Sequence, residues 1–251
     1  SGLMKLACFR LLSRQTVLEA KLCANFAAGD VGVGKTSFLV AWSKRFLQQN
    51  SVDLLFKHYS DLNHQNSRLN TLLFRILREM KTALNLRAEI PNDAQQLAST
   101  FAAWINALPF LSAKVVLVID GIDCVIDSIA STGNEPPKES KDKFNWLPEK
   151  IPPNTRLILS CCTGSEAYQV LTARNWPTYH MQVLDKPSRE QLIINLMKAR
   201  GLRLPRGAFD RLVKRHQAQN PLFLIQILRG IRTPEDIKPS GSMGSSLFSR
   251  S

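Results

Sequence analysis

Short apolar runs alternate with longer amphipathic segments along the first two thirds of the chain. The short runs predict five strands, at 22–28, 52–59, 114–119, 156–161 and 178–183. Segments of helical period lie between them, at 35–49, 67–84 and 94–108. This alternation is typical of an α/β fold, in which crossover helices join parallel strands. We expect a five-stranded, mainly parallel sheet flanked by helices, with the most continuously apolar run, 114–119, as its central strand.

The pattern changes near residue 185, where strand signals stop and helical periods continue at 188–200, 207–217 and 221–230. Ser188 and Gln191 have the spacing of a capping box, as do Asp93 and Gln96 before the 94–108 helix. We therefore predict an α/β core over 1–184 and a small helical subdomain over 185–235. The Ser- and Gly-rich segment 236–251 is predicted to be a flexible tail, and 131–150 a solvated loop followed by a short helix.

Composition adds charge to this picture. The chain has 251 residues, 44% of them hydrophobic, which suffices for a sizeable core. Its formal net charge is +13, and 186–251 alone carries +9, from thirteen Lys and Arg against four Asp and Glu. An anionic partner is indicated, whether nucleotide, nucleic acid or a membrane surface, although an ordinary solvated basic face is an equal alternative. The central apolar run of five residues, 115–119, is far below the ~20 that a membrane span needs.

Cysteine and histidine usage gives no metal or disulfide framework. None of the five cysteines forms a C-x-x-C pair, and the four histidines lack metal-ligand spacing. A reduced intracellular compartment fits this usage best. The adjacent Cys161 and Cys162 are interpreted as small buried hydrophobic residues.

The strongest chemical signal is the segment Gly29-Asp30-Val31-Gly32-Val33-Gly34-Lys35-Thr36, between a predicted strand and a predicted helix. It matches the phosphate-binding pattern G-x-x-x-x-G-K-[ST]. Glycines let the backbone N–H groups surround an anion, and the helix N-terminus adds positive dipole. We expect Lys35 to reach the outer phosphates and to serve catalysis, and the Thr36 hydroxyl to bind Mg²⁺.

The run 115–119 ends in Asp120, followed by Gly121, Ile122 and Asp123. Ligands of parallel sheets bind at the carboxyl ends of the strands, so Asp120 is the expected carboxylate partner of Mg²⁺. Asp123 is a candidate to activate water for attack on the terminal phosphate, and a turn or helix-capping role is as well supported.

Two weaker candidates complete the site. Ser160 ends the predicted fourth strand, where it would either sense the terminal phosphate or serve as a hydrogen-bonded strand-end residue. Pro221, in Asn220-Pro221-Leu222-Phe223, either opens a helix or packs against a nucleotide base.

Four motifs together resemble the STAND class of P-loop ATPases, in particular NACHT domains of the nephrocystin and telomerase-associated repeat protein type. They are 29–36 with the following Ser37 to Trp42, 115–123, the stretch 146–160, and 220–224. The resemblance covers roughly 20–232. It implies a five-stranded ATPase core with a small helical domain, ATP and Mg²⁺ as ligands, Gly29 to Ser37 and Pro221 as nucleotide contacts, and Asp120 as the metal carboxylate.

The sequence also departs from the family pattern. The family usually has Glu after the second Asp of the 120–123 motif, where this chain has Cys124, so slow hydrolysis is expected. Many NACHT proteins have Arg just after the fourth strand, where this chain has Cys161 and Cys162. The winged-helix segment and repeats of the family do not follow 235, so we expect a fragment or a reduced member.

The resulting hypothesis is an ATP-binding regulatory NTPase module, a nucleotide-dependent switch or signalling scaffold with weak Mg²⁺-dependent ATPase activity. We expect a cytoplasmic location, and the resemblance alone implies an association with the cilium. It also implies that protein partners bind through segments outside this chain. A nucleic-acid-binding module that uses the basic C-terminal helices is the first alternative. A scaffold with a vestigial nucleotide site is the second.

Overall fold

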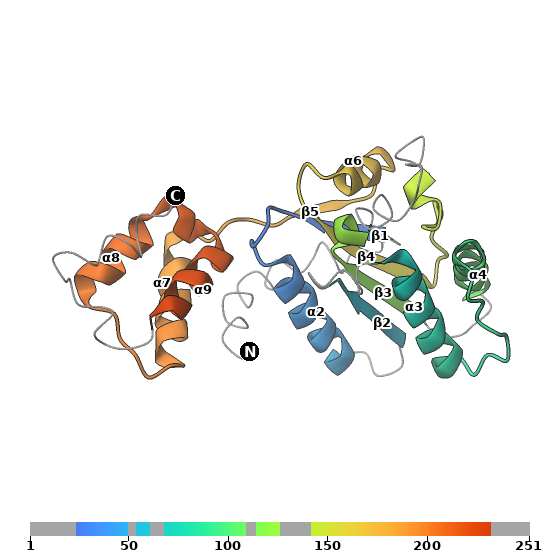
Figure 1. Cartoon of the computed structure of the whole chain (residues 1–251), viewed down its shortest axis with the longest axis horizontal. Coiled ribbons are helices and arrows are strands. Elements are labelled where there is room, and N and C mark those ends of the chain that lie inside the picture. Colours follow the sequence, from blue (N-terminus) through green and yellow to red (C-terminus); the bar gives the residue numbers. More distant parts are fainter. Residues whose placement is uncertain (1–23, 50–53, 61–67, 109–113, 126–141, 232–251) are drawn as a thin grey trace.

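The computed structural model describes residues 24–49, 54–60, 68–108, 114–125 and 142–231. These residues form an α/β core and a bundle of helices beside it, joined by the segment that leads from the last strand (Figure 1). The predicted tail 236–251 and the loop portion 131–141 lie outside the described residues.

All strand pairs of the sheet are parallel, as predicted, and the strand order is β2-β3-β4-β1-β5. The strands are β1 (Ala24–Ala28), β2 (Leu54–Tyr59), β3 (Val115–Asp120), β4 (Thr155–Cys161) and β5 (Thr178–His180). The prediction that 114–119 is central was wrong, because β4 lies in the middle of the sheet. A fully apolar run indicates burial on both faces, which β3 and β4 share, and so it leaves the order of the strands open.

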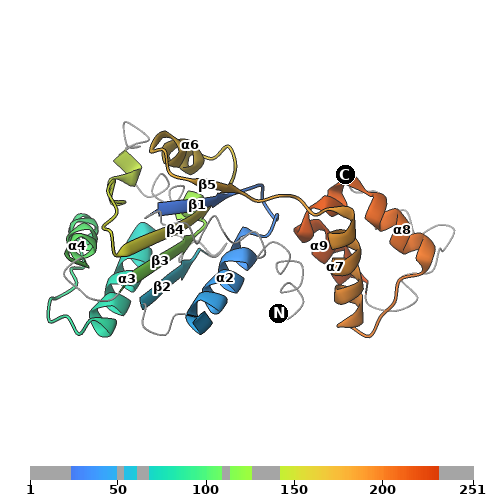
Figure 2. The same ribbon diagram turned by 180° about the vertical axis from the view of Figure 1, so that it is seen from behind.

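Helices cover both faces of the sheet (Figure 2). On one face Phe38, Leu39 and Trp42 of α2 (Lys35–Gln49) pack on Val116 and Val118. The other face carries α3 (Leu69–Ala83), α4 (Ala94–Ala107) and α6 (Glu166–Ala173), whose buried apolar residues belong to the same hydrophobic cluster as Leu117 and Ile119. Alternate residues of β3 thus serve opposite layers, as the two-residue period of a strand requires.

The helix ends follow local sequence signals. Asp93 caps α4, since its carboxylate accepts hydrogen bonds from the backbone N–H groups of Gln95 and Gln96. The expected cap at Ser188 is wrong: α7 (Lys186–Lys198) begins earlier, and Asp185 accepts the Ser188 N–H at 2.9 Å. Helix α6, capped by Ser165, was not predicted.

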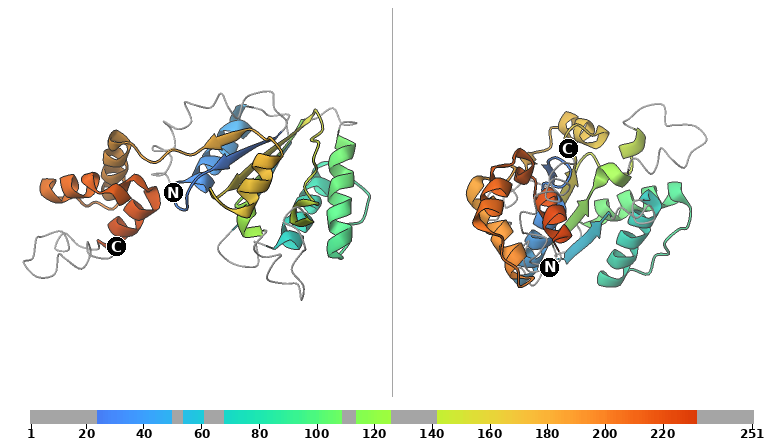
Figure 3. Two further views of the ribbon diagram at one scale, coloured as in Figure 1. Left: turned by 90° about the horizontal axis from the view of Figure 1, so that it is seen from above. Right: turned by 60° about the vertical axis from the view of Figure 1, so that its left-hand side comes forward.

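We call the bundle of α7, α8 (Arg206–Lys214) and α9 (Pro221–Gly230) the helical lobe. Viewed from above, it lies beside the core and is joined to it by the segment that follows β5 (Figure 3). It has a hydrophobic cluster of its own, which includes Ile193, Leu212 and Leu224 and no residue of the sheet. Residues 184 and 185, where we predict the domain boundary, lie between β5 and α7.

Candidate nucleotide-binding site

The predicted phosphate loop, residues 29–36, connects the end of β1 to the start of α2. Gly32 and Gly34 have φ values of +81° and +107°, which L side chains rarely adopt. A Cβ on Gly29 would lie 2.8 Å from Met181 Cβ, so this glycine is required by close packing as well. The loop therefore has the tight shape that brings backbone N–H groups around an anion at the N-terminus of α2.

Lys35, the first residue of α2, turns its side chain over this loop. Its Nζ donates hydrogen bonds to the carbonyl oxygens of Gly29 at 2.7 Å and Asp30 at 3.1 Å, and lies 3.3 Å from Cys162 Sγ. All three partners are neutral groups, and Lys35 forms no ion pair with any described residue. The positive charge of Lys35 is thus available to a phosphate bound at the loop.

Asp120 lies at the carboxyl end of β3 and is only 2% exposed. The Ser160 hydroxyl donates to its Oδ1 and accepts the Gly121 N–H at 2.9 Å. Burial raises the pKa of Asp120 above the ordinary 3.8, against the opposing effects of the Ser160 and Thr36 hydroxyls and the charge of Lys35. The Thr36 hydroxyl and the Asp120 carboxylate thus lie within hydrogen-bonding reach of each other beside the loop.

These oxygens fit Mg²⁺. The described residues contain no cluster of three or more His, Cys, Asp or Glu side chains able to hold a metal. Mg²⁺ does not need one, because it keeps several waters and takes one or two protein oxygens beside the phosphates. Thr36 and Asp120 are the residues that would hold the ion, which would neutralise phosphate charge there.

Ser160 lies deeper than a phosphate sensor would. It is fully buried, and its hydroxyl is engaged by Asp120 and Gly121. The structure therefore favours the strand-end alternative, in which Ser160 orients the Asp120 carboxylate.

The residue that reaches the phosphate loop from the end of β4 is Cys162. Besides its contact with Lys35, its backbone N–H donates to Asp123 Oδ2 at 3.0 Å. The pKa of the Cys162 thiol is raised to about 11, mainly by burial and to a smaller extent by the Asp123 carboxylate. Thr163 adds a second link, since its hydroxyl donates to the Asp30 carboxylate. Sequence reasoning missed both residues; the only signal was their position directly after a buried strand.

The helical lobe contacts the phosphate loop through the N-terminus of α9. Asn220 Nδ2 donates to the Val31 carbonyl at 2.7 Å, and the Leu222 N–H donates to the Gly32 carbonyl at 3.2 Å. A Cβ on Gly32 would come within 2.6 Å of Leu222 Cβ. Pro221 is buried in the first turn, between these two contacts. Asn220 belongs to the 220–224 motif, but no local pattern of residues indicated that it would contact the loop.

A parallel sheet in the order β2-β3-β4-β1-β5, a glycine loop from β1 to α2 and a carboxylate at the end of β3 together define a P-loop NTPase fold. Comparison with known proteins gives the family. The family model described as "NACHT domain" matches residues 25–200, and the chain belongs to this family.

The curated relatives are much longer than this chain. A TPR repeat-containing protein of Dictyostelium discoideum is 23% identical over 183 residues, which cover 58% of this chain and 10% of the relative. A putative tetratricopeptide repeat protein 41 of Homo sapiens is 25% identical over 147 residues, 57% of this chain and 11% of the relative. Telomerase protein component 1 of Rattus norvegicus is 23% identical over 216 residues, 80% of this chain and 8% of the relative. The chain thus spans about a tenth of their length.

Solved structures share the fold. The Aeropyrum pernix ORC2 protein in its ADP form has a TM-score of 0.54 at 15% identity, covering 90% of this chain and 60% of that chain. A Walker-type ATPase of Pyrococcus abyssi has a TM-score of 0.51 at 13% identity, covering 88% and 65%. These likenesses extend over the core and the helical lobe.

Proposed function

We propose that this chain is an ATP-binding regulatory module, in which the bound nucleotide controls how the helical lobe sits on the α/β core. The observation that carries the proposal is the contact between α9 and the phosphate loop, formed by Asn220 with Val31 and by Leu222 with Gly32. A ligand that changes the loop acts directly on this contact. A nucleotide that binds one arrangement of the lobe more tightly than the other would then shift the population toward the arrangement that it binds more tightly.

The proposal gives each residue a role. The backbone of Gly29 to Thr36, with Ser37, surrounds the phosphates, and Lys35 supplies positive charge to them. Thr36 and Asp120 hold Mg²⁺, and Ser160 orients Asp120 through its hydrogen bond. Pro221 packs near the nucleotide at the start of α9.

Hydrolysis is proposed to be slow. Asp123 is the candidate to orient water, but its Oδ2 accepts the Cys162 N–H at 3.0 Å. Cys124, next to it, offers no carboxylate in the place where the family usually has Glu. A slowly hydrolysed nucleotide keeps each state long enough to act as a signal, which suits a switch better than a motor.

The wider setting is also a proposal. Two of the relatives above are named for tetratricopeptide repeats, and we propose that protein partners bind through comparable segments of a longer protein. The described Cys161 and Cys162 are free thiols, which agrees with a cytoplasmic location. No described helix has the length and apolar character needed to cross a bilayer.

Calorimetric titration with ATP and Mg²⁺ tests the proposal, with GTP as a competitor. The Lys35→Ala substitution removes the charge over the loop, and we expect affinity to fall at least about tenfold. Lys44→Ala, an exposed lysine of the same helix, is the matched control and leaves affinity unchanged. Equal affinity of wild type and Lys35→Ala would exclude the loop as the nucleotide site.

The same preparation separates the alternatives. Affinity for DNA or RNA that falls steeply with salt and persists in Lys35→Ala would favour the nucleic-acid module. An unchanged Tm in saturating Mg-ATP would favour the scaffold with a vestigial site, because a ligand that binds only the folded state must stabilise it.

A further inference from the structure

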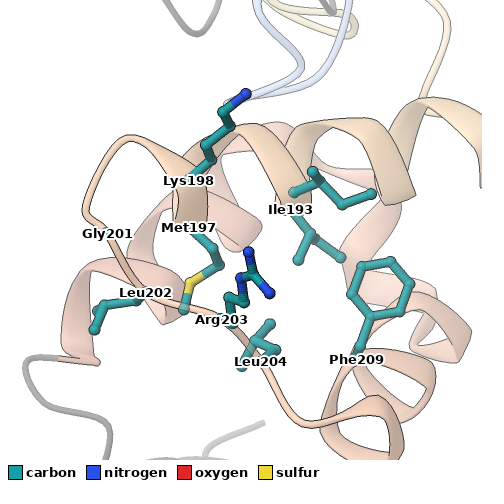
Figure 4. A pocket seen from close by; sticks show the side chains of 9 residues that line it. Ile193, Met197, Lys198, Gly201, Leu202, Arg203, Leu204 and Phe209 are labelled. Carbon is teal, nitrogen blue, oxygen red and sulfur yellow. The ribbon is translucent and has the colours of Figure 1, made fainter.

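A cavity of about 600 Å³ lies in the helical lobe (Figure 4), and none of the residues that line it is assigned to the nucleotide site. It is formed by the second half of α7, the 201–204 loop and Phe209 of α8. It opens to solvent and has the form of a groove.

The groove is apolar on its inner side. Ile193 and Met197 are 0% and 3% exposed and belong to the hydrophobic cluster of the lobe. Leu204 and Phe209 pack on this cluster and are only partly buried. Ile194, which also lines the groove, is 49% exposed. An exposed aliphatic side chain beside a hollow apolar surface indicates a place where another apolar group binds.

The backbone on one side of the groove is fixed by the end of α7. Gly201 has a φ of +67°, and the Leu202 N–H donates to the Met197 carbonyl at 3.0 Å. This is the hydrogen bond of a Schellman motif, in which glycine ends a helix and the next residue packs back on it. Leu202, which lines the groove, is therefore held in place before any partner binds, and a preformed groove lowers the ordering cost of association.

Only cations accompany this apolar lining. Lys198 and Arg203 are the charged residues of the groove, both are exposed, and neither forms an ion pair with a described residue. The stretch 186–231 contains ten Lys and Arg against two Asp and Glu. Some of these cations are structural: Arg189 donates to the Val213 carbonyl and Arg200 to the Leu228 carbonyl. Lys198 and Arg203 form no such bond with any residue that the structure describes, so they are available to an anionic partner.

We propose that this groove binds an acidic amphipathic segment of a partner protein. Aliphatic or aromatic side chains of the segment enter the groove between Ile194 and Phe209, and its carboxylates pair with Lys198 and Arg203. The combination favours protein over nucleic acid. A phosphate backbone would use the cations and leave the apolar floor unfilled, and the lining has a single aromatic ring, partly buried, instead of a stacking surface.

The test is a titration of the full chain with a synthetic helical peptide, followed by fluorescence anisotropy. The peptide has Leu and Phe at i, i+4 and i+7 and Glu at its remaining surface positions. A version with Lys in place of every Glu and a scrambled version of the same composition are the probe controls. We expect the acidic amphipathic peptide to bind at least about tenfold more tightly than either control.

Matched variants locate the site. Ile194→Glu, Lys198→Glu and Arg203→Glu are exposed changes, and each should weaken the acidic peptide at least about fivefold with an unchanged Tm. Arg229→Glu reverses an exposed cation on α9 outside the groove and should leave affinity within twofold. Equal binding of all three peptides, equal weakening by Arg229→Glu, or displacement by an oligonucleotide of similar charge would overturn the proposal. Because the lobe can bind a peptide whether or not Lys35→Ala abolishes ATP binding, this result is independent of the proposed nucleotide function.

Discussion

The buried position of Asp120 carries a cost in stability, because a carboxylate loses its hydration there. It is 2% exposed, and burial raises its pKa above 3.8, because removing the carboxylate from water disfavours its charged form. Ser160 offsets part of this cost by donating to Oδ1.

We predict that Asp120→Asn is at least as stable as wild type at pH 8 and loses the Mg²⁺ dependence of ATP affinity. The sign follows from the raised pKa: the folded protein binds the Asp120 proton more tightly than the unfolded chain, so stability falls as pH rises from 3.8 through the folded pKa and stays low above it. The Tm advantage of the variant therefore shrinks as pH falls through that window. Thermal melts and titrations with and without Mg²⁺ measure both effects. Asp210→Asn, an exposed change on α8, is the control. A variant that keeps its Mg²⁺ dependence contradicts the metal assignment.

Cys162 contacts both Lys35 and, through its N–H, Asp123, so its thiol lies inside the proposed site. With a pKa near 11, the thiol is protonated at pH 7.5 and reacts slowly with iodoacetamide. We expect site-resolved mass spectrometry to show labelling of Cys162 that rises with pH and is slowed by Mg-ATP.

The carboxamidomethyl group that iodoacetamide adds to Cys162 would occupy the space beside Lys35. We therefore expect the labelled protein to bind ATP at least about tenfold more weakly. Cys162→Ser keeps a small polar group at this position. It should bind ATP as the wild type does, and its ATP affinity should not fall on treatment with iodoacetamide. If ATP leaves the rate of Cys162 labelling unchanged, Cys162 does not line the nucleotide site.

At the scale of elements, the start of α9 has two tasks, which different atoms of Asn220 perform. Its Oδ1 accepts the Leu222 N–H at 2.9 Å and caps the helix, while Nδ2 bonds the Val31 carbonyl of the phosphate loop. A hydroxyl can cap the helix but lacks the amide donor, so the two tasks can be separated.

We predict that Asn220→Ser stays within about 0.5 kcal/mol of wild-type stability and exchanges the Leu222 amide hydrogen faster, because the link to the loop is weakened. Asp93→Ala is the control: it removes the cap of α4, costs about 1 kcal/mol, and leaves exchange at Leu222 unchanged. Hydrogen exchange by mass spectrometry measures both. Unchanged exchange at Leu222 in Asn220→Ser would mean that Nδ2 does not hold the lobe to the loop.

At the scale of the molecule, the two parts have separate cores. The cluster of the helical lobe shares no residue with the two clusters of the sheet, and the described contacts between the parts include the hydrogen bonds of α9 with the phosphate loop. Stability is therefore expected to divide between the parts.

Leu192→Ala tests this division, because Leu192 of α7 is 2% exposed and belongs to the cluster of the lobe. We expect a loss of roughly 2–5 kcal/mol confined to the lobe, with faster exchange over 186–231 and unchanged protection of β1, β3 and β4. Leu171→Ala in α6 is the converse control. It should lower protection from exchange in the α/β core and leave the helical lobe unchanged. Equal loss of protection in both parts after either change would show one cooperative unit.

The sequence by itself determined the elements whose signals are local. Helix α2 begins at Lys35 and ends at Gln49 as predicted, since a glycine loop precedes it, and α9 occupies Pro221–Gly230 as predicted, since proline fixes its first turn. The phosphate loop and the strand that ends in Asp120 could be predicted for the same reason, since their signals are also local. Helix α6 was not predicted, because its eight residues after Ser165 are too few for a helical pattern to be distinguished from that of a loop.

Only the tertiary structure decided the strand order and the neighbours of the phosphate loop. An apolar run indicates that a strand is buried, but it does not indicate the position of that strand in the sheet. The crossover connections between the strands decide which strand lies in the middle. Lys35 and Cys162 are 127 positions apart, and Val31 and Asn220 are 189 apart. Contacts over such separations follow from the packing of whole elements, and no local pattern of residue types encodes them.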